Sequence, residues 1–232
     1  MRSVIITGAS SGIGRATAEL FMARGWRVGL IARRSDVLAQ IAQGRPEAVV
    51  LPADVTDPEA MADAFAQFGP LDVLFNNAGV FGPSAPIDEV AVEEWERVVS
   101  VNLHGMFIAA RLAFGAMRKA GRGGRIINNG SISAHTPREN SVCYAVTKHA
   151  ITGLTKSLAL DGRPFDITAG QIDIGNAESA IIAGIKAAHP GTQTMDVAHA
   201  AESVLHMAQL PLSANIPFMT VMATKMPYLG RG

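Results

Sequence analysis

The chain has 232 residues, 48% of them hydrophobic, and its 20 lysines and arginines balance 20 aspartates and glutamates. A chain of this length can bury a large core without disulfide bonds, and the balanced charge argues against a nucleic-acid-binding protein. Its single cysteine, Cys143, excludes an internal disulfide and a cysteine-rich metal site. No apolar run approaches the ~20 residues of a membrane span, and the first residues, Met1–Gly8, lack a signal-peptide pattern. We therefore expect a cytoplasmic protein with no membrane partner.

Short apolar segments alternate with longer segments of helical periodicity along the whole chain. The predicted strands are Ser3–Thr7, Arg27–Ala32, Ala48–Leu51, Val73–Asn76, Arg125–Asn129, Asp166–Gln171 and Ile216–Val221. The predicted helices are Ile13–Arg24, Ser35–Gln43, Pro58–Gln67, Val92–Ala120, Ser141–Asp161, Glu178–Ala188 and Asp196–Gln209. Continuous apolar strands separated by helices are typical of a parallel sheet covered on both faces. We predict an α/β fold, a single doubly wound (Rossmann) domain over residues 1–232 with about seven strands, which binds ligands at the carboxyl ends of its strands.

The segment Val92–Ala120 is long for one helix and contains Gly105 and Gly115. Its first turn is acidic and its last turn is basic, in agreement with the helix dipole. We interpret it as one long helix with a possible break near residues 100–105.

A glycine-rich loop joins the first strand to the first helix. It reads Thr7-Gly8-Ala9-Ser10-Ser11-Gly12-Ile13-Gly14. In this context the first glycine allows a tight turn, the second lets backbone N–H groups approach a pyrophosphate, and the third lets the helix pack on the strand. The helix N-terminus adds free donors and partial positive charge. The loop therefore predicts a dinucleotide site made by Gly8, Ser10, Ser11, Gly12, Ile13 and Gly14, with an ordinary glycine-rich turn as the alternative.

The end of the second strand indicates which dinucleotide binds. NAD-selective sites offer an acidic side chain here to the ribose 2′-hydroxyl, whereas a nearby arginine accommodates the 2′-phosphate of NADP. This chain has Ala32 in place of the acid, followed by Arg33. NADP(H) is therefore favoured over NAD(H). The alternative interpretation is that Arg33 and Arg34 are an ordinary exposed pair that does not bind the cofactor.

Tyr144 and Lys148 are four residues apart in a predicted helix and share one of its faces. A phenol has a pKa of about 10, and a nearby ammonium favours its ionised form. A tyrosine whose pKa is lowered in this way can exchange protons with a substrate near neutral pH. Taken alone, this spacing also occurs by chance on a solvated helix face. Ser131, thirteen residues before the tyrosine, follows the fifth predicted strand.

Together these motifs resemble those of the short-chain dehydrogenase/reductase family, in its single-domain branch of about 250 residues. The matching pieces stand in the family's order and cover at least residues 3–161. They are Thr7-Gly8-x-x-x-Gly12-x-Gly14, Asp54-Val55, Asn76-Asn77-Ala78-Gly79, Val101-Asn102, Ser131 and Tyr144-x-x-x-Lys148. The resemblance implies an oxidoreductase that transfers a hydride between a nicotinamide cofactor and a small carbonyl or alcohol substrate. Arg33 favours NADP(H) as that cofactor.

The resemblance also implies a role for each matching residue. Tyr144 is expected to be the acid/base, Ser131 rather than Ser133 to bind the substrate oxygen, and Lys148 to lower the tyrosine pKa and bind ribose. Asn102 is expected to hold a water that relays protons from the lysine. The expected contacts with the rest of the cofactor come from Asp54, Val55, Asn76, Ala78 and Gly79. Family members commonly pair their long helices across subunits, so a homodimer or homotetramer is expected.

The match weakens after the sixth predicted strand. The family usually has Pro-Gly there, and this chain has Ile172-Asp173. Main-chain groups from Ile174 to Asn176 remain able to hold the carboxamide. Residues 174–195 are expected to form a lid over the substrate, and its small apolar side chains do not specify which substrate. His135 is a candidate for the pocket wall, although a surface loop position is the simpler interpretation.

Two other functions stay open at this point. One is a regulatory or scaffold protein that binds NADP(H) without turnover, although such a protein has no need of the set Asn102, Ser131, Tyr144 and Lys148. The other is a structural subunit whose long helices serve assembly.

Overall fold

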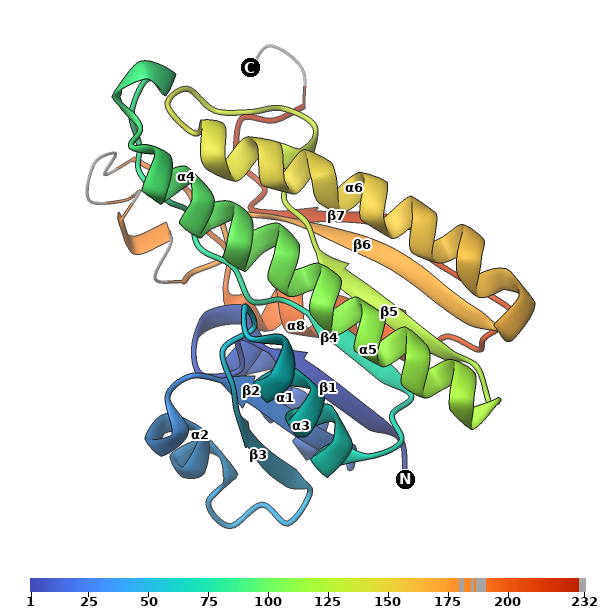
Figure 1. Ribbon diagram of the computed structural model, residues 1–232. Helices are drawn as coiled ribbons and strands as arrows, with labels where there is room; N and C mark the ends of the chain where they lie inside the picture. Colours follow the sequence, from blue (N-terminus) through green and yellow to red (C-terminus); the bar gives the residue numbers. More distant parts are fainter. Residues whose placement is uncertain (180–181, 185, 187–190, 230–232) are drawn as a thin grey trace.

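The computed structural model describes residues 1–179, 182–184, 186 and 191–229. Seven strands form one sheet in the order β3-β2-β1-β4-β5-β6-β7, and every neighbouring pair is parallel (Figure 1). The strands are β1 (Ser3–Thr7), β2 (Arg27–Ala32), β3 (Ala48–Pro52), β4 (Val73–Asn76), β5 (Gly124–Asn129), β6 (Ile167–Gly175) and β7 (Phe218–Met222). This confirms the predicted doubly wound sheet.

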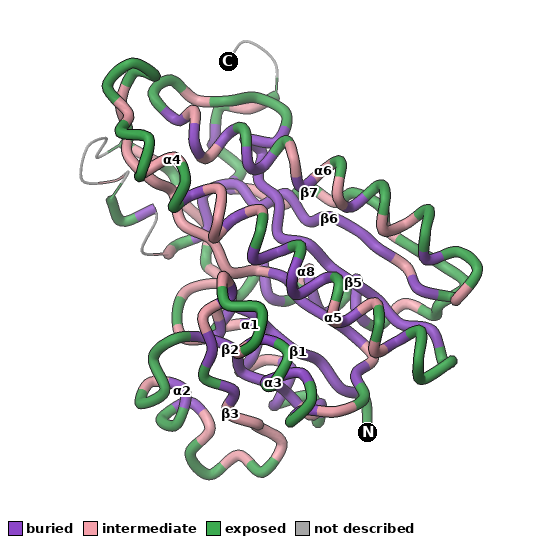
Figure 2. Tube along the Cα trace, viewed as in Figure 1, coloured by how far each residue is buried: buried purple, intermediate pink, exposed green. Residues whose placement is uncertain are grey.

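Helices cover both faces of the sheet, as predicted. On one face α1 (Gly12–Ala23), α2 (Ser35–Ala42) and α8 (Val197–Gln209) enclose one apolar cluster with the strands. On the other face α3 (Pro58–Phe68), α5 (Gly105–Ala120) and α6 (Val142–Gly162) enclose a second cluster. In Figure 2 the central strands β1, β4 and β5 are buried along their length, while the helices turn exposed residues outward. The described residues also form short 3₁₀ turns at η1 (Ile87–Glu89), η3 (Ile132–Ala134) and η4 (Arg163–Phe165).

The long helical segment is interrupted where the break was expected. Helix α4 (Val92–Val99) continues through a π-helical turn, η2 (Ser100–His104), into α5. The whole stretch Val92–Ala120 is long and apolar enough to cross a membrane by length and composition. However, Ile108, Ala109 and Ala113 belong to the buried cluster on the sheet. Packing against the sheet therefore accounts for the apolar composition.

Strand β6 is longer than predicted and ends at Gly175 instead of Gln171. Its extra residues pair with β7, up to Gly175 opposite Met222, and Ile172 and Ile174 are buried in the core. Asp173 consequently lies within a strand instead of in a loop. Of the predicted helix Glu178–Ala188, residues 182–184 and 186 are helical, and 180, 181, 185, 187 and 188 lie outside the described residues.

The topology defines where a ligand can bind. Strand β1 lies between β2 and β4, so the chain leaves β1 toward one edge of the sheet and returns on its other side. The loops after β1 and β4 therefore diverge and leave a crevice at their carboxyl ends.

Candidate active site

A cavity of about 620 Å³ opens at this crevice. It is lined by nearly all of the predicted site residues: Gly8, Ser10, Ser11, Gly12, Ile13, Gly14, Arg33, Asp54, Val55, Ala78, Gly79, Ser131, Tyr144, Lys148 and Ile174. Asn76 and Asn102 are not among its lining residues. The fold thus gathers residues from six strand ends and the start of α6 around one space.

The glycine loop has the shape that a pyrophosphate requires. Gly8 and Gly12 have left-handed φ angles of +69° and +51°. A β-carbon on Gly14 would lie 2.3 Å from the carbonyl oxygen of Gly8, so only glycine fits where α1 meets β1. The N-cap residue Ser11 makes no side-chain cap bond, which leaves N–H groups of the first turn available to an anion. The loop therefore fits the phosphates of a dinucleotide.

A chain of hydrogen bonds links this loop to the opposite wall of the cavity. The Thr7 hydroxyl accepts from the backbone N–H groups of Asn77 (2.8 Å) and Ala78 (3.0 Å). Asn129 Nδ2 donates to Asn77 Oδ1 (2.8 Å), and Lys148 Nζ donates to the Asn129 carbonyl (2.7 Å). Four segments far apart in the sequence are thereby held in register around the cavity.

Of the two asparagines that end β4, the second borders the cavity. Asn77 is a lining residue. Asn76 points into the protein, where its Nδ2 donates to the Met106 carbonyl (2.7 Å) and to Asn128 Oδ1 (3.3 Å). Sequence reasoning chose Asn76 for the cofactor, but the structure gives it a bracing role between β4, β5 and α5.

Two arginines border the cavity at the end of β2. Arg33 is exposed, and its Nη1 lies 3.9 Å from Asp54 Oδ2. Arg34 Nη2 donates to Ser10 Oγ at 3.0 Å, which ties it to the glycine loop. Sequence reasoning assigned only Arg33, whereas both guanidinium groups reach the same end of the cavity.

Tyr144, Ser131 and Lys148 line the other end of the cavity. Burial raises the pKa of Tyr144, while hydrogen bonding with Ser131 and the positive charge of Arg138 lower it. Lys148 Nζ lies 5.4 Å from the centre of the phenol ring. Burial lowers the pKa of Lys148 to about 8, against the nearby charge of Asp173, which raises it.

The groups that lower the pKa of Tyr144 are not the one that we expected. We predicted that Lys148 lowers the pKa of Tyr144, but the groups that lower it are Ser131 and Arg138. Lys148 is itself buried, and its Nζ donates a hydrogen bond to the Asn129 carbonyl. The phenol ring is further fixed by Phe81, whose ring centre lies 5.0 Å away.

Asn102 lies in the π-helical turn and is fully buried. Its Oδ1 accepts from Val80 N–H (2.8 Å), and its Nδ2 donates to the Val80 carbonyl (2.8 Å) and to Thr147 Oγ1 (3.2 Å). Both amide protons are therefore used within the protein. The side chain clamps the loop after β4 to α6, so it positions the helix that carries Tyr144 and Lys148.

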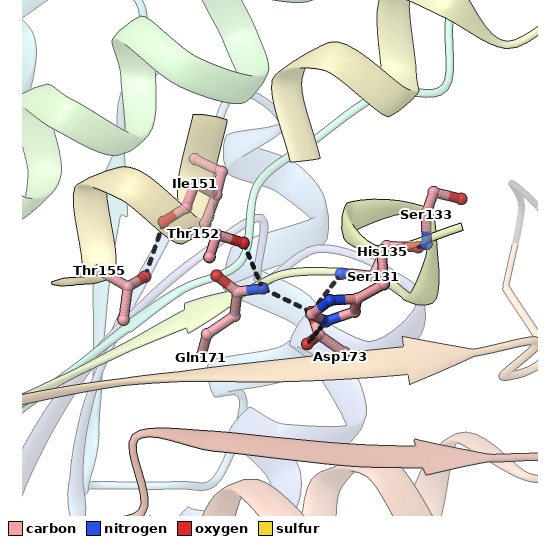
Figure 3. Close-up of polar contacts among 8 residues, drawn as sticks. All are labelled: Ser131, Ser133, His135, Ile151, Thr152, Thr155, Gln171 and Asp173. Carbon is pink, nitrogen blue, oxygen red and sulfur yellow. Dashed lines mark hydrogen bonds and ion pairs between the residues drawn. The ribbon is translucent and has the colours of Figure 1, made fainter. Parts of the chain in front are cut away.

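Asp173 lies behind Ser131, and the sequence analysis gave it no role in the site. The buried carboxylate accepts from the Ser131 N–H (2.9 Å), from Gln171 Nε2 (2.7 Å) and from His135 Nε2 (2.8 Å). Figure 3 shows these groups converging from β6 and the loop after β5. The Ser131 hydroxyl in turn accepts from Ser133 N–H (3.1 Å). Asp173 thus fixes the backbone of the serine, and the signal available in the sequence was the acid in place of the family's glycine.

The cavity wall beyond Ile174 is also built by hydrogen bonds. Strand β5 ends at Asn129, which pairs with Ile172 of β6. Strand β6 therefore continues beyond the end of β5, and Ile174 borders the cavity. Asn176 has a left-handed φ of +53° and accepts from Arg138 Nη2 at 2.7 Å. These are the groups available to a carboxamide. His135 is not among the lining residues and serves Asp173 instead.

Comparisons with known proteins agree with this geometry. A family model described as short chain dehydrogenase matches residues 2–189. Cis-4-hydroxycyclohexanecarboxylate dehydrogenase of Sinomonas cyclohexanicum is 36% identical over 193 residues, which cover 80% of this chain and 77% of that protein.

Two solved structures are also similar. A 3-oxoacyl-[acyl-carrier protein] reductase with bound NAD from Brucella melitensis superposes with a TM-score of 0.85 and 30% identity, covering 95% of this chain and 89% of that one. The closed form of serine dehydrogenase complexed with NADP+ has a TM-score of 0.92 over 99% and 98% of the two chains; at 22% identity it shows the fold alone. The chain belongs to the short-chain dehydrogenase/reductase family, as an NAD(P)-dependent oxidoreductase of CH–OH and C=O groups.

Proposed function

We propose that the protein is an NADP(H)-dependent reductase or dehydrogenase of small carbonyl and alcohol compounds, with Tyr144 as the acid/base. The observation that carries this proposal is that one cavity holds Ser131, Tyr144 and Lys148 at one end and the glycine loop at the other. A protein that only sensed the dinucleotide would need the loop but not the hydroxyl pair. Turnover is therefore favoured over a regulatory role.

The chemistry proposed for these side chains follows from their positions. The bound nicotinamide supplies or accepts the hydride. The Ser131 and Tyr144 hydroxyls donate to the substrate oxygen, which stabilises the negative charge that develops there during reduction. Tyr144 then gives its proton to the substrate oxygen. The Ser131 hydroxyl and the Arg138 charge, which lower the pKa of the phenol, favour the phenolate that remains, and the Lys148 ammonium binds the nicotinamide ribose. Asp173 and Asn102 hold the serine and the helix in place.

The preference for NADP(H) rests on Arg33 and Arg34. Both guanidinium groups border the end of the cavity that lies beside β2, where Ala32 carries no competing charge. An arginine forms charge-assisted hydrogen bonds with phosphate, which a ribose hydroxyl cannot match. The solved neighbours hold NADP+ in one case and NAD in another, so this chain's own residues carry the argument.

We expect Arg33→Ala and Arg34→Ala each to weaken NADPH binding about 10-fold or more while changing NADH binding less than about 3-fold, because charge-assisted bonds contribute roughly 1.5–3 kcal/mol. Fluorescence titration with both cofactors measures the ratio. Arg45→Ala, which changes a partly exposed arginine outside the cavity, is the control. An unchanged NADPH/NADH ratio in both variants would remove the cofactor assignment.

The pH profile is expected to follow Lys148. Its pKa of about 8 means that the ammonium is charged below that pH and neutral above it, so the rate of carbonyl reduction should fall as the pH rises through about 8. The Asp173 charge raises the pKa of Lys148, and Asp173→Asn should therefore move the fall to lower pH. Plots of kcat/KM for reduction between about pH 6 and 10 test this. A shift to higher pH in the variant would contradict it.

The substrate is sought with a panel assayed in both directions with both cofactors. It contains aldehydes, acyclic ketones, quinones and secondary alcohols. Cyclic 4-oxo and 4-hydroxy acids are included because the relative from Sinomonas is named for such a substrate. Turnover of any class supports the proposed function. If the dinucleotide binds and the whole panel stays inert, the regulatory alternative replaces it.

We also propose a single domain, a cytoplasmic location and a homodimer or homotetramer. Of the lid expected over residues 174–195, Ile174 and Gly175 belong to β6, and 180, 181, 185 and 187–190 lie outside the described residues. Large apolar side chains exposed on α5 and α6 support assembly: Phe107 is 49% exposed, Val146 46% and Leu160 57%. Such side chains are typical of surfaces that other subunits cover. Native mass measurement distinguishes monomer, dimer and tetramer.

A further inference from the structure

The charges around the cavity are unequal in sign. Of its lining residues, five are cationic and one, Asp54, is acidic. Arg33 and Arg34 lie at the end of the cavity assigned to the cofactor. Lys148 lies with the catalytic residues Ser131 and Tyr144 at the other end. Two arginines then remain, Arg97 and Arg138.

These two arginines differ in their partners. Arg97 Nη2 lies 2.7 Å from Glu94 Oε2 and forms an ion pair on α4. Arg138 has no ion pair with a carboxylate within the described part of the chain. Its one side-chain hydrogen bond there runs from Nη2 to the amide oxygen of Asn176. A guanidinium has five N–H donors, so most of its capacity remains for a ligand.

Arg138 is also partly removed from water. The residue is half-buried, and this burial lowers the pKa of its guanidinium. A partly desolvated cation without a counter-ion is costly, and the cost is relieved when an anion binds. The Arg138–Asn176 bond fixes the orientation of the side chain, and the Ser141 hydroxyl holds the Arg138 carbonyl at 2.6 Å. The cation is therefore positioned before any ligand arrives.

The location of Arg138 points to the substrate. It lines the same cavity as Ser131 and Tyr144, and its charge acts on the Tyr144 phenol. It also borders a second cavity of about 570 Å³, together with Ile87 and Val146. The guanidinium thus stands where the catalytic cavity meets an adjoining, partly apolar space.

We propose that Arg138 binds a carboxylate of the substrate, so that the protein acts on oxo acids and hydroxy acids in preference to neutral ketones and alcohols. This inference rests on the proposed function, since it names the substrate class of that same site. The planar guanidinium and a carboxylate form two parallel hydrogen bonds, which also orient the carbonyl toward Tyr144.

The test compares each acid with its methyl ester, which has the same carbonyl and no charge. The probes are 4-oxocyclohexanecarboxylate and 4-oxopentanoate with their methyl esters. We expect the wild-type protein to prefer the acid of at least one pair by about 10- to 100-fold in kcat/KM, as charge-assisted hydrogen bonds predict. Arg138→Met should abolish that preference through KM. Because the Arg138 charge also lowers the pKa of Tyr144, the variant should change kcat for the acid and for its ester by the same factor. Arg138→Lys should keep part of it, and Arg97→Met should leave the acid/ester ratio unchanged.

A binding measurement provides a readout besides turnover. Calorimetry with the NADP+-loaded protein compares cyclohexanecarboxylate with cyclohexanecarboxamide in the wild type and in Arg138→Met. Carboxylate binding that is lost only in the variant supports the proposal. Equal binding in both proteins overturns it, as does a variant whose defect is in NADP+ affinity.

The two proposals fail in different ways. If neutral ketones are reduced and acids show no advantage, the carboxylate subsite is wrong and the reductase function stands. If neither class reacts with either cofactor, the reductase function is wrong. In that case the calorimetry still decides whether Arg138 binds carboxylates.

Discussion

Tyr144→Phe is expected to lower kcat for carbonyl reduction by about 10³-fold or more, because general acid catalysis contributes roughly 10²–10⁴-fold and the variant has no proton to donate. The phenyl ring keeps its packing against Phe81, so the fold and the glycine loop should be unaffected. Affinity for NADPH should therefore change less than about 2-fold. Steady-state kinetics together with fluorescence titration of the cofactor measure both quantities.

The chain offers a matched control, because it contains only two tyrosines. Tyr228 packs against the small apolar cluster around Met226 and lies outside the cavity. Tyr228→Phe should keep full activity. Substantial turnover in the Tyr144 variant, for example more than a tenth of the wild-type rate, would remove the phenol from the mechanism.

Gly14→Ala is expected to cost about 2–4 kcal/mol of unfolding free energy and to weaken NADPH binding more than about 10-fold. The added β-carbon would lie 2.3 Å from the Gly8 carbonyl oxygen and 2.6 Å from Asn77 Nδ2. Neither atom can move freely, since one belongs to the loop backbone and the other donates to the Thr7 carbonyl at 2.9 Å. Thermal and urea unfolding, each with and without NADPH, measure the two effects.

The same substitution elsewhere provides the control. Gly115 lies on the exposed side of α5, and a β-carbon there would meet nothing within 4 Å. Gly115→Ala should therefore stabilise the helix by about 0.5–1 kcal/mol, the ordinary preference for alanine over glycine. If both variants behaved alike, helix propensity alone would explain the result and the close contact at the loop would be irrelevant.

Local patterns in the sequence determined the fold class and most of the proposed site. Alternation of apolar strands with helical segments predicted the parallel sheet, since the central strands β1, β4 and β5 are buried on both faces and need no partner-specific signal. The glycine loop and the pair Tyr144 and Lys148 were recognisable because their spacing is set locally, and the role of Ser131 followed from the family resemblance. The topology then brought them to one cavity, as expected for strands whose carboxyl ends meet at one edge.

Contacts between residues far apart in the chain were decided only by the tertiary structure. Asn77 rather than Asn76 faces the cavity because Thr7, 70 residues away, accepts its N–H. Asp173 fixes Ser131 across 42 residues, which required β6 to continue along β7 to Gly175. Arg138 is oriented by Asn176 in the same way. Such pairings depend on which strand ends lie side by side and how deeply each charge is buried, and neither property is encoded in the local pattern of residues.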